Sequence, residues 1–233
     1  MSRTCAVMFA IWADDRVIRY VEQIAERFEE LNNMEVLIFK NKALRGKFLS
    51  STEYSKYHVW ELVPDDVDRV IYFDHDTLPL RPLPMDECPD VDIAMVPERK
   101  EVFDACASGW PIIRRAGVYF NSRFFIAKRT TSHLFERMNL RQTHAVSNKS
   151  PWFVDQTFLN VELLAASEEG KLTYSSLPPK WANLVLTDPE PVKDPCMLRF
   201  VEGPPHRLRA VGHILRQLKD IERAVEIQRR LKR

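Results

Sequence analysis

The sequence lacks an apolar run long enough to cross a bilayer, a Cys-x-x-Cys pair and a marked excess of charge of either sign. The first absence argues against a membrane-spanning protein, and the second argues against a structural zinc site. The formal net charge of +1 gives no general electrostatic reason to bind nucleic acid. The first residues also lack the basic and apolar regions of a signal peptide. We therefore expect a cytoplasmic protein that does not bind nucleic acid.

The composition is that of an ordinary globular chain. Of the 233 residues, 45% are hydrophobic and 29% are charged, which is enough to bury one substantial core. Residues 4–11 form an apolar run of strand length, and apolar positions at spacings of four and three from Val17 to Leu31 predict a helix. Residues 35–39 predict a second strand. The crossover in this strand, helix and strand unit has a length that suits a parallel pair.

The rest of the chain predicts further strands and a helix. Residues 70–73, 91–96 and 118–127 are rich in β-branched and aromatic side chains, which favours strands. A helical pattern covers residues 152–166, and residues 198–201 predict a last strand. We therefore expect a single α/β domain whose sheet is mainly parallel at first and more mixed in its second half.

The segment Asp74-His75-Asp76 carries the strongest chemical signal. It directly follows the apolar run 70–73, so both carboxylates are expected where a buried strand leaves the core. Two carboxylates this close repel each other unless a positive charge lies between them. A divalent cation with hard oxygen ligands satisfies both, and a metal at the carboxyl end of a strand is typical of a site for a phosphate-bearing substrate.

Two other interpretations of this pair are open. The carboxylates can simply cap a turn after the strand, which is a common position for Asp. They can also belong to a phosphatase of the haloacid dehalogenase type, in which a strand ends in Asp-x-Asp-x-Thr. Thr77 lies one residue too early for that motif, and Leu78 occupies the required place. The phosphatase is therefore disfavoured.

Blocks spread over residues 4–206 resemble glycosyltransferase family 8, in that family's order and at similar intervals. These blocks are Trp12-Ala13-Asp14-Asp15, Tyr54-Ser55-Lys56, Glu61-Leu62-Val63-Pro64, Val70-Ile71-Tyr72-Phe73-Asp74-His75-Asp76-Thr77, Tyr119-Phe120-Asn121-Ser122 and Asp155-Gln156-Thr157-Phe158-Leu159-Asn160. The resemblance implies a GT-A fold, a single Rossmann-like α/β domain with a mixed, mainly parallel central sheet flanked by helices. It also implies a nucleotide-sugar donor, Mn²⁺ or Mg²⁺, and retention of the anomeric configuration.

By this resemblance the chain moves a sugar from a nucleoside-diphosphate sugar, with UDP-hexose as the expected donor, to a hydroxyl group. The expected acceptor is a carbohydrate, a lipid-linked glycan or a protein-linked glycan. Two rival functions are a catalytically silent GT-A-like module that binds nucleotide sugars and an inverting transferase. The inverting reaction needs a general base, for which Asp155 is the candidate.

The resemblance places the cation on Asp76, with Asp74 as a direct ligand or in contact with the ribose, where the cation bridges the two phosphates of the donor. The family completes this site with a late histidine, but this chain has Phe200 at the aligned position. His206 is the nearest replacement ligand, and a histidine in a surface loop is the alternative interpretation. If His206 does not bind, the two carboxylates, phosphates and water hold the cation, as is normal for Mg²⁺.

The resemblance also implies the residues at the donor sugar. Lys56 would place a positive charge near the phosphate or the sugar, and Asn121 and Ser122 would bond sugar hydroxyls. Asp155 would bond hydroxyls too, with a capping role at a helix start as the alternative. Gln156 would lie opposite the leaving group, where its amide oxygen stabilises an oxocarbenium-like centre.

For the nucleotide and diphosphate, the resemblance points to the end of the first strand and to two loops. The predicted contacts there are Ala10, Ile11, Trp12, Asp14, His75 and Gly203. Residues 1–213 are assigned to the glycosyltransferase domain, and residues 214–233 to a C-terminal amphipathic helix with a basic end. This helix either packs on the domain or makes weak contact with an anionic membrane surface.

Overall fold

The computed structural model describes residues 3–11, 13, 15–40, 55–75, 77–145, 154–184 and 194–199. The strands are β1 (Arg3–Phe9), β2 (Val36–Phe39), β3 (Val67–Phe73), β4 (Thr77–Pro79), β5 (Ile93–Pro97), β6 (Phe120–Lys128), β7 (Tyr174–Ser176), β8 (Asn183–Leu184) and β9 (Met197–Arg199). The α-helices are α1 (Asp15–Asn32), α3 (Val59–Leu62), α4 (Lys100–Ala107), α5 (Pro111–Ala116), α6 (Ser132–Ala145) and α7 (Val154–Glu168). The 3₁₀ turns are η2 (Lys56–His58), η3 (Met85–Glu87), η4 (Arg129–Thr131) and η6 (Pro179–Trp181).

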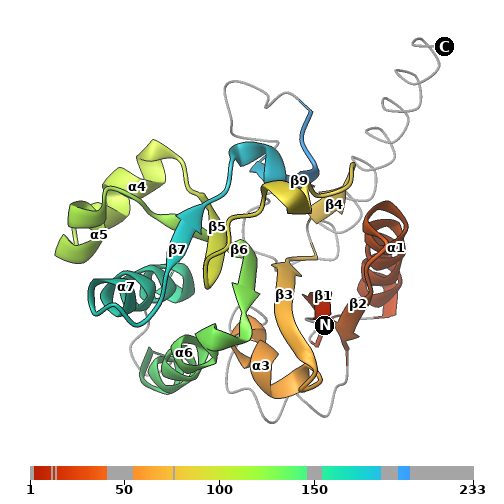
Figure 1. Cartoon of the computed structure of the whole chain (residues 1–233), viewed down its shortest axis with the longest axis horizontal. Helices are drawn as coiled ribbons and strands as arrows, with labels where there is room; N and C mark the ends of the chain where they lie inside the picture. The colour runs from red at the N-terminus through yellow and green to blue at the C-terminus, as the bar shows by residue number, and fades with distance from the viewer. Residues whose placement is uncertain are drawn as a thin grey trace.

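A six-stranded sheet in the order β2-β1-β3-β6-β5-β7 forms the centre of the fold (Figure 1). β1 runs parallel to β2 and β3, and β5 runs parallel to β7. β6 is antiparallel to both of its neighbours, β3 and β5. The prediction of a mixed, mainly parallel sheet flanked by helices is confirmed.

The first strand, helix and strand unit forms as its apolar pattern predicts. α1 buries Val21, Ile24 and Phe28, which are spaced by three and four residues, in the cluster that includes the sheet. Asp15 lies in the first turn of α1, where a carboxylate interacts favourably with the helix dipole. β2 follows α1 and pairs in parallel with β1.

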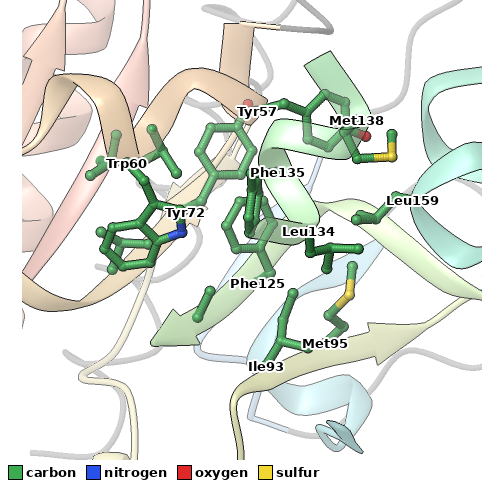
Figure 2. Packing of buried hydrophobic residues seen from close by; sticks show 14 of the residues in the cluster. Tyr57, Trp60, Tyr72, Ile93, Met95, Phe125, Leu134, Phe135, Met138 and Leu159 are labelled. Carbon is green, nitrogen blue, oxygen red and sulfur yellow. The ribbon is translucent and has the colours of Figure 1, made fainter. Parts of the chain in front are cut away.

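Helices cover both faces of the sheet. Successive side chains of a strand point to opposite faces, so neighbouring residues of one strand enter different clusters. On β1, Cys5 belongs to a cluster that includes η2, α3, α6 and α7, whereas the next residue, Ala6, belongs to a cluster that includes α1. Figure 2 shows the first cluster, in which the rings of Tyr72 and Phe125 stack with centroids 4.8 Å apart. With both faces covered, the strand ends are the places where the sheet can present polar groups.

A small second sheet in the order β4-β9-β8 lies beyond the end of β3. β4 pairs antiparallel with β9, and β9 pairs parallel with β8. β9 confirms the predicted strand at residues 198–199, the part of the range 198–201 that the structure describes, and begins one residue earlier, at Met197. Within the described residues, no helix combines the length and the apolar character needed to cross a membrane. The helix predicted at residues 214–233 lies outside the described residues.

Candidate active site

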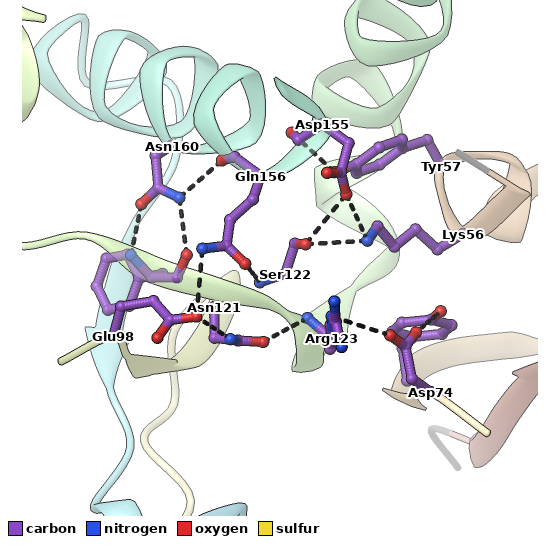
Figure 3. Close-up of polar contacts among 12 residues, drawn as sticks. Lys56, Tyr57, Asp74, Glu98, Asn121, Ser122, Arg123, Asp155, Gln156 and Asn160 are labelled. Carbon is purple, nitrogen blue, oxygen red and sulfur yellow. Dashed lines mark hydrogen bonds and ion pairs between the residues drawn. The ribbon is translucent and has the colours of Figure 1, made fainter. Parts of the chain in front are cut away.

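Three strands bring polar residues to one edge of the sheet. β3 and β5 end at this edge, and β6 begins there because it runs in the opposite direction. Asp74 follows β3, Glu98 follows β5, and Asn121 and Ser122 lie at the start of β6. The beginning of α7, with Gln156, lies next to the same strand ends (Figure 3). The topology therefore gathers residues that are far apart in the sequence.

The start of β6 is irregular at this edge. Between the backbone pairs Met95–Phe125 and Pro97–Phe120, β5 contains a single residue whereas β6 contains residues 121–124. Such bulges redirect side chains, and they are common next to active sites. The irregular segment is the one that carries the side chains predicted to bind the donor sugar.

Lys56 forms a buried ion pair with Asp155. Its Nζ lies 2.7 Å from Asp155 Oδ2, and the two side chains are 2% and 11% exposed. Lys56 Nζ also donates to Ser122 Oγ at 2.9 Å, and Ser122 Oγ donates to Asp155 Oδ2 at 3.2 Å. The Lys56 ammonium thus binds Asp155 and Ser122. A direct contact between Lys56 and a donor stays a prediction.

The side-chain amides of Asn121 and Gln156 share an acceptor, Glu98. Asn121 Nδ2 and Gln156 Nε2 both donate to Glu98 Oε1, the second at 3.3 Å. Gln156 Oε1 in turn accepts from the backbone N–H of Ser122 at 3.1 Å. Gln156 is 2% exposed and Asn121 is 5% exposed, so both amides are held inside the edge of the sheet.

Further hydrogen bonds dock the start of α7 on β6 and η2. Asn160 Oδ1 accepts from Phe120 N at 2.6 Å, and Asn160 Nδ2 donates to Phe120 O at 2.8 Å. Tyr57 Oη donates to the backbone carbonyl of Asp155 at 3.1 Å. These bonds fix the first turn of α7 and therefore the positions of Asp155 and Gln156.

Tyr119 lies directly before β6 and contacts the same helix. Its hydroxyl and the Thr157 hydroxyl are 2.9 Å apart and share a hydrogen bond. Burial is the main cause that raises the pKa of the Tyr119 phenol above its usual range. The phenol therefore stays neutral and keeps its hydrogen bond at physiological pH.

Asp74 is held by two neighbours on the strands. Tyr72 Oη donates to Asp74 Oδ1, and Arg123 Nε lies 3.6 Å from Asp74 Oδ2. The backbone N–H of Thr77 donates to the Asp74 carbonyl at 3.1 Å and closes a turn that contains His75. The carboxylate is about one-fifth exposed, at 20%. Asp74 is thus both anchored and accessible.

The other predicted donor contacts are only partly described. Ala10 and Ile11 follow β1 and are buried, at 3% and 0% exposure, and their contact with the nucleotide stays a prediction. His75 is half-buried beside Asp74. The remaining predicted site residues lie outside the described residues; they are Trp12, Asp14, Asp76, Gly203 and His206.

The described residues supply only some of the ligands that a divalent cation needs. Asp74 offers hard carboxylate oxygens, which Mg²⁺ and Mn²⁺ prefer. Among the described residues there is no group of three His, Cys, Asp or Glu side chains that could hold a metal ion. Asp74 therefore supplies one suitable ligand, and a cation held jointly with Asp76 stays a prediction.

Sequence reasoning missed four residues of the site: Tyr72, Glu98, Arg123 and Asn160. Glu98 lies two residues after the strand predicted at residues 91–96, so its position near the end of a strand was a usable signal. Asn160 closes a block that does carry predicted site residues. The contact of Arg123 with Asp74 depends on the pairing of β3 with β6, which no local pattern reveals, whereas Tyr72 lies only two residues before Asp74 in the sequence.

Comparisons with known proteins agree with this architecture. Residues 6–94 match the sequence profile described as Glycosyl transferase family 8. The match runs from the middle of β1 to the start of β5 and includes the Asp74-His75-Asp76 segment. A search of curated proteins finds no match. The resemblance to family 8 predicted from the sequence is confirmed over this part of the chain.

Solved structures share the fold at low sequence identity. The galactosyltransferase LgtC, solved with donor and acceptor sugar analogues, is 17% identical, covers 92% of this chain and 94% of its own, and has a TM-score of 0.60. A glycosyltransferase involved in the glycosylation of the major capsid of PBCV-1 is 11% identical over 91% of this chain and 98% of its own, with a TM-score of 0.56. Mouse xyloside xylosyltransferase 1 is 12% identical over 85% of this chain and 97% of its own, with a TM-score of 0.50. The fold is therefore that of GT-A glycosyltransferases.

Proposed function

We propose that this chain transfers a sugar from a nucleoside-diphosphate sugar to a hydroxyl of a glycan acceptor. The chain has the GT-A fold, and its residues 6–94 match glycosyltransferase family 8. The expected donor is a UDP-hexose, the anomeric configuration is retained, and Mn²⁺ or Mg²⁺ takes part. The observation that most supports this proposal is the meeting of Asp74, Asn121, Ser122, Asp155 and Gln156 at one edge of the sheet.

The chain's own residues would bind and orient the donor. Asn121, Ser122 and Asp155 supply amide, hydroxyl and carboxylate groups of the kind that bond sugar hydroxyls. Asp74 is anchored by Tyr72, so its carboxylate does not need to be ordered when the donor binds. A divalent cation held at Asp74 and Asp76 would offset the negative charge that develops on the leaving nucleoside diphosphate.

Gln156 suits the stabilisation of a positive anomeric carbon. Its Oε1 accepts one hydrogen bond from Ser122 N, and a carbonyl oxygen has a second lone pair for a nearby positive charge. As the bond from the anomeric carbon to the phosphate oxygen breaks, the acceptor oxygen bonds to the same face of that carbon. The acceptor proton then passes to an oxygen of the leaving diphosphate.

The surroundings of Asp155 favour retention over inversion. An inverting reaction needs a carboxylate that takes the acceptor proton. Asp155 Oδ2 is bonded to Lys56 and Ser122, and its side chain is 11% exposed. A carboxylate fixed in this way is better suited to orienting a neighbour than to accepting a proton from an incoming hydroxyl.

The test is a screen of UDP-, GDP- and TDP-sugars with Mn²⁺, in which free nucleoside diphosphate is measured with and without sugar acceptors. We expect turnover with at least one donor, and we expect Asp74→Ala and Asp76→Ala to abolish it without loss of the fold. Asp68→Ala is the matched control, because Asp68 is exposed at the opposite end of β3. Absence of turnover with every donor, despite tight nucleotide-sugar binding, would instead identify a silent binding module.

A further inference from the structure

Glu98 lies at the centre of the hydrogen bonds that join β5, β6 and α7. It follows β5, is half-buried, and accepts hydrogen bonds on one oxygen, Oε1, from both Asn121 Nδ2 and Gln156 Nε2 (Figure 3). Its own backbone N–H donates to the Tyr119 carbonyl at 2.7 Å, which fixes the start of the side chain. Glu98 therefore links two side chains of the proposed active site.

The hydrogen-bond partners define which way both amides point. Asn121 Oδ1 accepts from Arg123 N at 2.8 Å, and Gln156 Oε1 accepts from Ser122 N at 3.1 Å. An ionised carboxylate can only accept, so Glu98 requires the NH₂ group of each amide to face it. Backbone donors on one side and a carboxylate on the other thus select one of the two amide orientations for each residue.

We propose that Glu98 is a positioning residue for Gln156 and Asn121. It holds the Gln156 amide so that the carbonyl oxygen, and not the NH₂ group, is available to the anomeric carbon. The inference rests on the proposed glycosyl transfer, in which an NH₂ group at that place would oppose a developing positive charge. Loss of the acceptor at Glu98 leaves each amide with one bond fewer, so that only the backbone N–H bonded to its oxygen still restrains its rotation.

Rotation of the amide is expected to affect turnover more than donor binding. Small displacements of a group that acts on the reacting atoms cost up to about 100-fold in rate. We expect donor affinity to depend mostly on contacts with the nucleotide and diphosphate, which are predicted to come from other segments than Glu98. A selective loss of kcat is therefore the signature of the positioning role.

Two substitutions separate the hydrogen bonds from the negative charge. Glu98→Ala removes the acceptor, and we expect kcat to fall roughly 10- to 100-fold with KM changed less than about 3-fold. Glu98→Gln keeps a carbonyl oxygen that can accept from both amides, so it should retain most of the activity. Glu101→Ala is the control, because Glu101 is an exposed residue in the first turn of α4.

A second readout does not depend on catalysis. In the ligand-free protein, the side-chain NH₂ signals of Asn121 and Gln156 should be resolved and slow to exchange with solvent by ¹H–¹⁵N spectroscopy. They should remain so in Glu98→Gln and exchange faster in Glu98→Ala. Thermal denaturation of all variants verifies that they are folded.

Unchanged kcat together with unchanged NH₂ exchange in Glu98→Ala would overturn the inference. Equal losses in Glu98→Gln and Glu98→Ala would overturn it as well, because they would assign the effect to charge. If the wild-type protein turns over no donor, the proposed function fails, and the exchange measurement still decides whether Glu98 orients the two amides.

Discussion

Replacing Lys56 with Met should destabilise the protein far more than its position beside a proposed active site suggests. Lys56 Nζ lies 2.7 Å from Asp155 Oδ2 and 2.9 Å from Ser122 Oγ. Met has a side chain of similar length but no charge. The variant therefore keeps most of the packing and leaves the Asp155 carboxylate without its cation.

The size of the loss follows from the burial of both partners. At an effective dielectric constant of 20, two unit charges 4 Å apart attract by about 4 kcal/mol. Removal of one partner of a buried pair typically costs ~3–5 kcal/mol, because the remaining charge is buried and uncompensated. The side chains of Lys56 and Asp155 are 2% and 11% exposed, so the full range applies. We expect the free energy of unfolding to fall by about 3–5 kcal/mol.

The measurement is urea denaturation followed by circular dichroism, with the slope compared between variants. Lys100→Met is the matched control, since Lys100 and Asp104 form a pair on α4 whose side chains are 77% and 53% exposed. Exposed helical pairs of this spacing contribute about 0.3–0.5 kcal/mol. The two Lys→Met variants therefore differ in burial and not in chemistry.

A double variant tests whether the loss comes from the unpaired carboxylate. Lys56→Met combined with Asp155→Asn removes both charges, and it should recover a large part of the stability lost in Lys56→Met alone. A loss below about 1 kcal/mol in Lys56→Met, together with weaker donor binding, would refute the reasoning. That result would mean that the ammonium serves the donor and not Asp155.

Two further predictions concern catalysis and pH. Gln156→Ala should lower kcat more than it weakens donor affinity, as measured by steady-state kinetics and calorimetry; a pure loss of affinity would assign Gln156 to binding only. Burial raises the pKa of the Cys5 thiol to about 11, so the folded state holds this proton more tightly than the unfolded state does. The contribution of Cys5 to stability is therefore present below the pKa of the unfolded state and is lost as pH rises from about 9 to about 11. Over this interval the free energy of unfolding of the wild type should fall by up to ~3 kcal/mol relative to that of Cys5→Ala, as measured by denaturant titrations. Parallel pH profiles of the two proteins would contradict this.

The parts of the fold that were predicted are those with strong local patterns. α1 follows from apolar residues at spacings of three and four, and β3 follows from the run that ends at Phe73. β4 and β8 were missed because they have three and two residues and exist only through pairing with β9, which is remote in the sequence. The reversed direction of β6 likewise depends on its neighbours and not on its own residues.

The site shows the same division between local signals and tertiary contacts. Asp74, Asn121 and Ser122 could be found because polar residues beside apolar strands mark the edge of a sheet. Lys56 was expected near the donor, but its burial against Asp155 results from the docking of α7, which the sequence does not reveal. Glu98 was missed because its role arises from the bulge in β6 that brings Asn121 toward it.

The proposed active site is built so that its carboxylates are compensated before a donor arrives. Asp155 is paired with Lys56, and Asp74 lies beside Arg123, so two of the negative charges at this edge already have a cation from another element. Such pairing fixes side chains in place and reduces the reorganisation that binding would otherwise require. A divalent cation bound at Asp74, as proposed, would share that carboxylate with Tyr72 and Arg123. Because like charges repel, the Arg123 guanidinium would weaken the attraction of Asp74 for a metal ion, so we expect a substantial part of the metal's affinity to come from the diphosphate of the donor. Cation and donor are therefore expected to bind as one unit, each tightly only when the other is present.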